Sequence, residues 1–280
     1  MKKFFFDSIG HLDLLVWTLV ILFFCGSALL FGGNLQYSFI GAGGVILEML
    51  LIGIAIELII ECLKNTKGIG TITGFITNGP EALCLLVGLL VGDIIFAAST
   101  PLGSNFMNPI LLFFAALVCR QVVATAKTNP VYTVSTVLGT AIFAGSFFFI
   151  DEKYYIYWVI AATVYGLITF FKRPQEAHAE EIEEHHINPR VWLLPAVIIL
   201  TVTGYFLDSV VTFAATHSHA PKGVIGFLVL ATLTSWPEFK SCISLLARRN
   251  HLAAILNIAV SNITNIWLAA AGVATYLVSR

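Results

Sequence analysis

The amino-acid sequence predicts an all-α polytopic membrane protein with about nine transmembrane helices, and three observations support this prediction. The 280 residues are 58% hydrophobic and only 11% charged, whereas soluble domains carry about 25% charged residues. Nine apolar stretches are long enough to cross the roughly 30 Å hydrocarbon core of a bilayer. A short motif that combines proline with glutamate occurs twice within these stretches. So few charged side chains cannot cover a soluble surface, whereas lipid solvates apolar side chains directly.

The predicted spans divide the chain into four parts. Residues 1–35 form an extra N-terminal transmembrane helix, for which a cleaved signal peptide is the alternative, because two lysines precede it. Residues 36–172 hold five helices, 173–189 form a polar loop rich in Glu and His, and 190–280 hold three helices. The nine spans cover residues 12–33, 38–62, 69–98, 100–126, 130–150, 154–171, 191–214, 223–247 and 251–278.

The distribution of basic residues predicts the orientation of the chain. With nine spans, eleven Lys and Arg residues lie on one side and three on the other, and Lys240 lies within a span. The positive-inside rule then predicts a cytoplasmic N-terminus and an outside C-terminus in a cell inner or plasma membrane. The polar loop 173–189 is therefore expected in the cytoplasm, as a solvated linker or as a segment that senses pH or metal ions.

Composition and motifs also exclude several functions. A net charge of −1 argues against nucleic acid as a partner, which leaves membrane lipid and small ions. The five cysteines lie apart in apolar stretches, so neither a disulfide framework nor a zinc site is expected. The sequence has no nucleotide loop, H-E-x-x-H motif or nucleophile–base pair. We therefore expect neither an enzyme nor a bound cofactor.

An internal repeat carries the chemistry. A T-x-x-P-E motif lies in the third span and again in the eighth; in each copy a serine follows the glutamate by 23 residues and an asparagine follows it by 27. The two spans run in opposite directions, so the copies are predicted to be inverted-topology repeats, whose sites lie near the membrane midplane. The matched residues are Thr77, Glu81, Ser104 and Asn108, and Thr234, Glu238, Ser261 and Asn265.

Each part of the motif has a physical role. Pro80 and Pro237 have no N–H, so the helix breaks or kinks there and leaves carbonyl groups free to bind cations. An ionised carboxylate in the middle of a membrane needs a cation or a proton. Glu81 and Glu238 directly follow these prolines and are the predicted metal ligands.

Hydroxyl and amide side chains follow each glutamate at intervals of four residues, which places them on one face of a helix. Their oxygens, facing a carboxylate, would form a hard-cation site, and the alternative is polar packing between membrane helices. The predicted cation-binding residues are Glu81, Glu238, Thr77, Asn78, Ser104, Asn108, Thr234, Ser235, Asn257, Ser261 and Asn265.

Other charges lie within or near the spans. Glu48 is a candidate for an ion pathway, and Asp93 is expected at the outer end of its helix, where it attracts cations or is simply solvated. Glu57 and Glu61 are expected at the membrane interface. Lys240 should point away from Glu238 and extend to the membrane surface.

These residues resemble the calcium/cation antiporter superfamily of sodium/calcium and cation/proton exchangers. Its two repeats carry a G-T-S-L-P-E-like motif followed by a G-N-x-x-G-S-N-x-x-N/D-like motif, and the resemblance covers about 70–115 and 227–272. It implies that the two glutamates bind Ca²⁺, while Thr, Ser and Asn oxygens and backbone carbonyls complete the Ca²⁺ and sodium sites. It also implies ten core helices, of which the second half here lacks two; span 12–33 has the direction of the family's last helix.

The chain departs from the family pattern at three positions. Asn78 stands where sodium exchangers usually carry Ser, Thr100 replaces the Asn of the first copy, and Asn265 stands where sodium/calcium exchangers often have Asp. The driving ion, Na⁺ or H⁺, therefore stays open. The predicted function is a secondary antiporter that exchanges Ca²⁺ or a similar divalent cation for Na⁺ or H⁺. The alternatives are a monovalent cation/proton antiporter, a passive cation channel and a transport-inactive membrane protein.

Overall fold

The protein is an all-α integral membrane protein, as the composition predicts. The computed structural model describes residues 9–91, 94–176, 188–220, 233 and 235–279, and within these ranges every regular element is a helix. Eight described helical segments are long and apolar enough to cross a membrane. The remaining predicted span, 223–247, lies partly outside the described residues, which show its final part as a helix.

The helix bounds follow the predicted spans closely except in two of them. The predicted span 69–98 is divided into two helices. The predicted span 100–126 is shifted, because its helix begins earlier and ends at Val118, where Arg120 adopts a left-handed conformation (φ 57°) and stops the helix. The helices are α2 (His11–Phe31), α3 (Leu35–Leu63), α4 (Ile69–Ile76), α5 (Gly79–Val91), α6 (Ile94–Val118), α7 (Val122–Lys127), α8 (Pro130–Phe147), the 3₁₀ turn η1 (Glu152–Tyr154), α9 (Tyr155–Phe171), α10 (Pro189–Ser218), α13 (Trp236–Ala247) and α14 (His251–Val278).

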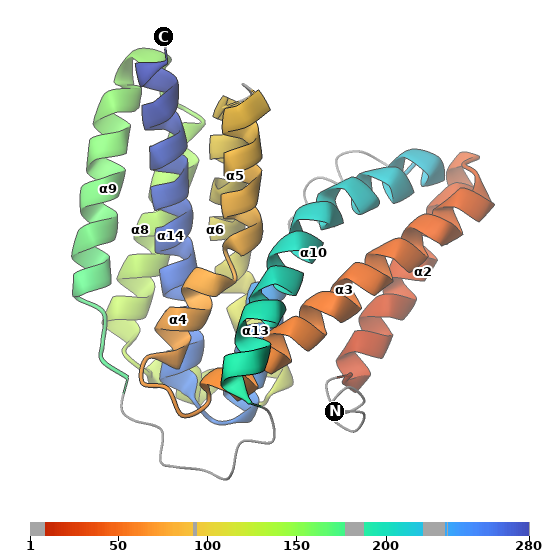
Figure 1. Ribbon diagram of the computed structural model, residues 1–280, viewed down its shortest axis with the longest axis horizontal. Coiled ribbons are helices and arrows are strands. Elements are labelled where there is room, and N and C mark those ends of the chain that lie inside the picture. Colours follow the sequence, from red (N-terminus) through yellow and green to blue (C-terminus); the bar gives the residue numbers. More distant parts are fainter. Residues whose placement is uncertain (1–8, 92–93, 177–187, 221–232, 234, 280) are drawn as a thin grey trace.

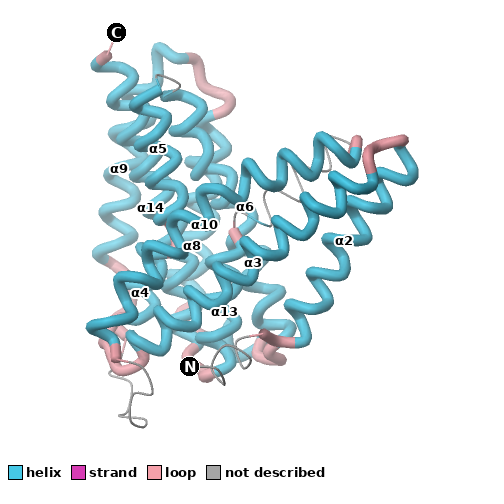
Figure 2. Tube along the Cα trace, turned by 45° about the vertical axis from the view of Figure 1, so that its right-hand side comes forward, coloured by secondary structure: helices cyan, strands magenta, loops and turns pink. Residues whose placement is uncertain are grey.

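The helices form two groups that lean apart (Figure 1). Helices α5, α6, α8, α9 and α14 form an upright bundle, while α2, α3 and α10 form an inclined group; α4 and α13 lie where the groups meet. The same division is visible after a 45° turn (Figure 2). Helix α14 is central, since most of its residues are buried and it packs against α4, α5, α6, α8, α9 and α13.

The predicted break of the third span is confirmed. Thr77 and Asn78 form a turn between α4 and α5, directly before Pro80. The Asn78 side-chain amide donates to the Gly74 carbonyl at 2.6 Å, which replaces part of the interrupted backbone pattern. In the second copy α13 begins at Trp236 with its proline in the first turn, the position where a missing N–H costs least.

Two glycines bring α4 unusually close to α14. A Cβ on Gly74 would lie 2.6 Å from the Asn257 carbonyl oxygen and 3.2 Å from the Ser261 nitrogen. A Cβ on Gly70, one turn earlier, would overlap the Ala253 backbone. Small residues spaced four apart permit this kind of backbone contact between membrane helices. The contact places the end of α4, with Thr77 and Asn78, beside the polar face of α14.

We expect Gly74→Val to destabilise the protein by about 1–3 kcal/mol, because the added atoms meet backbone that cannot move independently. The melting temperature of the purified protein measures this effect. The control is Gly43→Ala on α3, where nothing lies within 4 Å of an added Cβ. An unchanged melting temperature for Gly74→Val would contradict the close approach of α4 and α14.

Candidate cation-binding site

The two glutamates of the repeat occupy equivalent places in two short helices. Glu81 lies in the first turn of α5 and Glu238 in the first turn of α13, and their exposed fractions are 5% and 0%. A helix N-terminus carries a partial positive charge, which favours a negative side chain there.

Each glutamate accepts a hydrogen bond from the serine 23 residues further along. Ser104 of α6 bonds to Glu81, and the Ser261 hydroxyl of α14 lies 3.1 Å from Glu238 Oε1. The identical spacing in the sequence therefore corresponds to the same contact in space.

The helices α6 and α14 are joined by reciprocal asparagine contacts. The Asn105 side-chain amide donates to the Asn262 carbonyl at 3.3 Å, and Asn262 donates to the Asn105 carbonyl at 3.4 Å. Asn108 then donates to Asn262 Oδ1 at 2.9 Å, while Asn265 donates to Asn105 Oδ1 at 3.3 Å. Contacts that remain the same when the partners are exchanged are those that a two-fold axis produces.

Ser261 connects the two copies directly. Its hydroxyl lies 3.3 Å from Asn78 Oδ1 as well as 3.1 Å from Glu238 Oε1, and it accepts from the Asn108 amide at 3.2 Å. A hydroxyl has one proton, so Ser261 can donate to only one of the two oxygens, Asn78 Oδ1 or Glu238 Oε1, at a time.

The site contains more buried oxygen atoms than the surrounding donors can satisfy. These atoms have no hydrogen-bond partner among the described residues, and burying such groups is costly unless something else satisfies them. Carboxylate, amide and hydroxyl oxygens are the ligands of hard cations such as Ca²⁺. The unsatisfied oxygens are Glu81 Oε2, Glu238 Oε2, Thr77 Oγ1, Ser235 Oγ, Asn108 Oδ1, Asn257 Oδ1 and Asn265 Oδ1.

Most of the predicted site residues belong to this region, including Asn257, whose amide lies 3.5 Å from the Glu238 carbonyl. Thr234 and Asp93 lie outside the described residues. Glu48 is half-buried on α3 and takes part in none of the hydrogen bonds above. In the part of the chain that the structure describes, no three His, Cys, Asp or Glu side chains form a metal cluster, so the site depends on two carboxylates and neutral oxygens.

Sequence reasoning missed the structural role of Asn105 and Asn262. Both stand next to a predicted site residue and lie 157 residues apart, as do the two glutamates, so the repeat offset could have identified them. The prediction that Lys240 extends to the membrane surface is wrong, because its side chain is 7% exposed and pairs with Asp13.

A known protein family matches part of this chain. A family model described as sodium/calcium exchanger protein matches residues 191–278. This match supports membership of the calcium/cation antiporter superfamily. Comparisons with curated proteins and with solved structures found no match. The segment matched to the exchanger family contains Glu238 and Ser261, and members of this family are transporters rather than enzymes. The match covers the second of the two regions on which the resemblance rests.

We expect Ser104→Ala and Ser261→Ala to weaken cation binding, because each substitution removes the serine hydroxyl that donates a hydrogen bond to a glutamate of the site. Loss of one hydrogen bond to a charged group corresponds to about 1.5–3 kcal/mol, or roughly tenfold or more in affinity. Calcium titration of the purified variants measures the change. Ser135→Ala is the control, since that hydroxyl bonds only within its own helix. Affinity unchanged in both site variants would contradict the assigned contacts.

Proposed function

We propose that this exchanger-family protein is a secondary active antiporter that moves Ca²⁺, or a similar divalent cation, in exchange for H⁺ or Na⁺ by alternating access. One observation carries the proposal: two buried carboxylates from equivalent broken helices lie in a site with an excess of oxygen atoms. The reciprocal contacts of α6 and α14 support an inverted repeat, the architecture that places substrate sites between two halves.

The charge of the site favours a divalent ion. Glu81 and Glu238 contribute a formal charge of −2, which one Ca²⁺ neutralises. Calcium takes six to eight oxygen ligands in flexible geometry, and the carboxylates, amides and hydroxyls of the site offer ligands of that kind.

The same charge explains why transport would be coupled. Two ionised carboxylates without a cation are strongly unfavourable in a low-dielectric interior. After Ca²⁺ leaves, the site is expected to accept protons or Na⁺ before it can return to the other side. Exchange therefore follows from electrostatics, because either protons or Na⁺ can neutralise the two carboxylates after Ca²⁺ leaves.

Two alternatives use the same scaffold. A monovalent cation/proton antiporter is favoured if Ca²⁺ does not compete for the site, and a channel or a transport-inactive protein is favoured if flux is passive or absent. Purified protein in liposomes separates them: uphill Ca²⁺ movement driven by a Na⁺ or pH gradient supports the antiporter, and the other outcomes contradict it.

We expect Glu81→Gln and Glu238→Gln each to abolish divalent transport while the protein stays folded, because an amide keeps the shape of the side chain but removes half of the charge of the site. Calcium uptake into proteoliposomes measures transport, and size-exclusion chromatography monitors folding. The control is Glu152→Gln, at an exposed position in η1. Uptake near the wild-type rate in either site variant would show that the binding site lies elsewhere.

We further expect nearly electroneutral exchange, with two monovalent ions for each Ca²⁺. A third monovalent ion would leave net positive charge in the site, which is unfavourable in the membrane interior. Calcium flux measured at imposed membrane potentials should change little with voltage. Steep voltage dependence would indicate that another carboxylate, with Glu48 as the first candidate, belongs to the site.

A further inference from the structure

The short helix α13 carries charged side chains on two faces. Glu238 belongs to the cation site, whereas Lys240 contacts α2 and α3. Two residues correspond to about 200° around an α-helix, so the two side chains leave α13 in nearly opposite directions. One rigid element therefore connects the cation site with a second set of charges.

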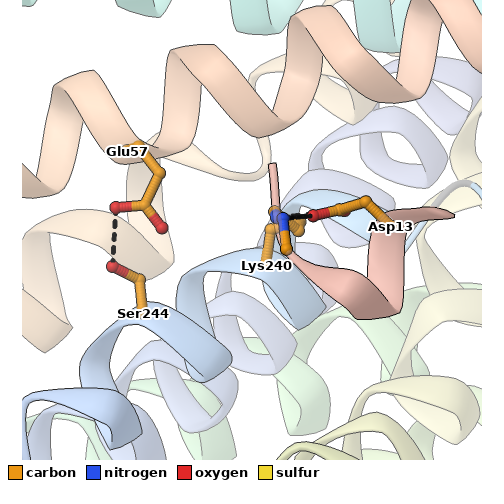
Figure 3. A network of polar contacts seen from close by, with 5 residues as sticks. Asp13, Glu57, Lys240 and Ser244 are labelled. Carbon is orange, nitrogen blue, oxygen red and sulfur yellow. Dashed lines mark hydrogen bonds and ion pairs between the residues drawn. The ribbon is translucent and has the colours of Figure 1, made fainter. Parts of the chain in front are cut away.

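Lys240 forms a buried ion pair with Asp13 in the first turn of α2 (Figure 3). The ammonium nitrogen lies 2.9 Å from Oδ2 and 3.1 Å from Oδ1, and the exposed fractions of the two side chains are 7% and 8%. On the way the Lys240 side chain passes over Gly53 of α3, where an added Cβ would lie 3.3 Å from Cε. Three helices thus meet at one ammonium group.

Helix α3 supplies a second acidic contact on the same side of α13. The Ser244 hydroxyl donates to Glu57 Oε2 at 3.0 Å (Figure 3), and an Arg248 nitrogen lies 3.7 Å from the same oxygen. Lys240, Ser244 and Arg248 are spaced four residues apart, so they form one stripe along α13. The stripe holds α13 in one register against α2 and α3.

The ion pair resists displacement of α13 more strongly than apolar packing does. Apolar contacts are non-directional, so a helix can slide along them at modest cost. A slide or rotation of α13 would separate the Lys240 ammonium from Asp13 and leave two buried charges unpaired, which is strongly unfavourable. Because Glu238 lies two residues from Lys240, the pair also fixes the place of its carboxyl group beside Ser261.

We propose that Asp13 and Lys240 are positioning residues of the cation site, and that α2 is part of the transport unit through them. The pair holds α13 so that the Glu238 carboxyl group keeps its contact with Ser261. This role rests on the proposed cation-binding function, and it extends that function to an N-terminal helix that supplies none of the predicted cation ligands.

The test compares neutral variants of the full-length chain. Asp13→Asn removes the charge but keeps a side-chain oxygen that can accept from the Gly10 N–H, as Asp13 does at 2.8 Å. Asp13→Asn/Lys240→Gln removes both charges and leaves no buried charge unpaired. The control is Asp151→Asn/Lys153→Gln, which neutralises an exposed ion pair in the same way. Two quantities are measured: the melting temperature without Ca²⁺, and the Ca²⁺ concentration that gives half of the Ca²⁺-induced rise in melting temperature.

A positioning role predicts that the half-saturating Ca²⁺ concentration rises about tenfold or more in both Asp13 variants, because small displacements of a ligand are costly. The melting temperature without Ca²⁺ should fall in the single variant and stay near that of the wild type in the double one. The charge-reversed variant Asp13→Lys/Lys240→Asp should recover part of the Ca²⁺ response. The exposed control should match the wild type in both measurements.

Two results would overturn the proposal, and they are distinguishable. If the double neutral variant responds to Ca²⁺ like the wild type while Glu238→Gln does not respond, the pair has no positioning role and the proposed function stands. If the wild type itself shows no Ca²⁺ response, the proposed function fails, and the positioning role fails with it. If the single variant does not fold, the double variant still decides between these outcomes.

Discussion

The main electrostatic constraint on this membrane protein is the burial of two carboxylates, Glu81 and Glu238. The broken helices stabilise the two carboxylates, because each glutamate lies at the N-terminus of a helix, which carries a partial positive charge. The Ser261 hydroxyl adds a hydrogen bond to Glu238, and the excess of amide oxygens offers further ligands to a cation. In the proposed function, a transported cation balances the remaining negative charge, so the features that permit burial are also those that favour binding.

A second charge balance on the other face of α13 supports the first. Lys240 and Asp13 neutralise each other across α2 and α13, while Glu57 and Arg248 do so across α3 and α13. Helix α13 is therefore held by directional contacts on the side opposite to the site. A short helix with a functional carboxylate needs such support, because apolar packing alone does not define its register.

Much of this arrangement could be predicted from the sequence, since its causes are local. Apolar length predicts the spans, and proline predicts the break before Glu81. The repeat spacing predicts that Ser104 and Ser261 make the same contact. The pair of Asp13 and Lys240 could not be predicted, because its members are 227 residues apart and no pattern links them. The end of α6 at Val118 was missed because the left-handed turn at Arg120 has no glycine to signal it.

In the proposed antiporter, Glu81 and Glu238 together form one cation site built from both copies of the repeat. Isothermal titration calorimetry of the purified chain with Ca²⁺ tests this proposal. We expect one Ca²⁺ to bind to each chain, displaced competitively by Na⁺ or by protons, and no saturable binding in the double variant Glu81→Gln/Glu238→Gln. Saturable Ca²⁺ binding that survives the loss of both carboxylates would show that the two glutamates do not form the site.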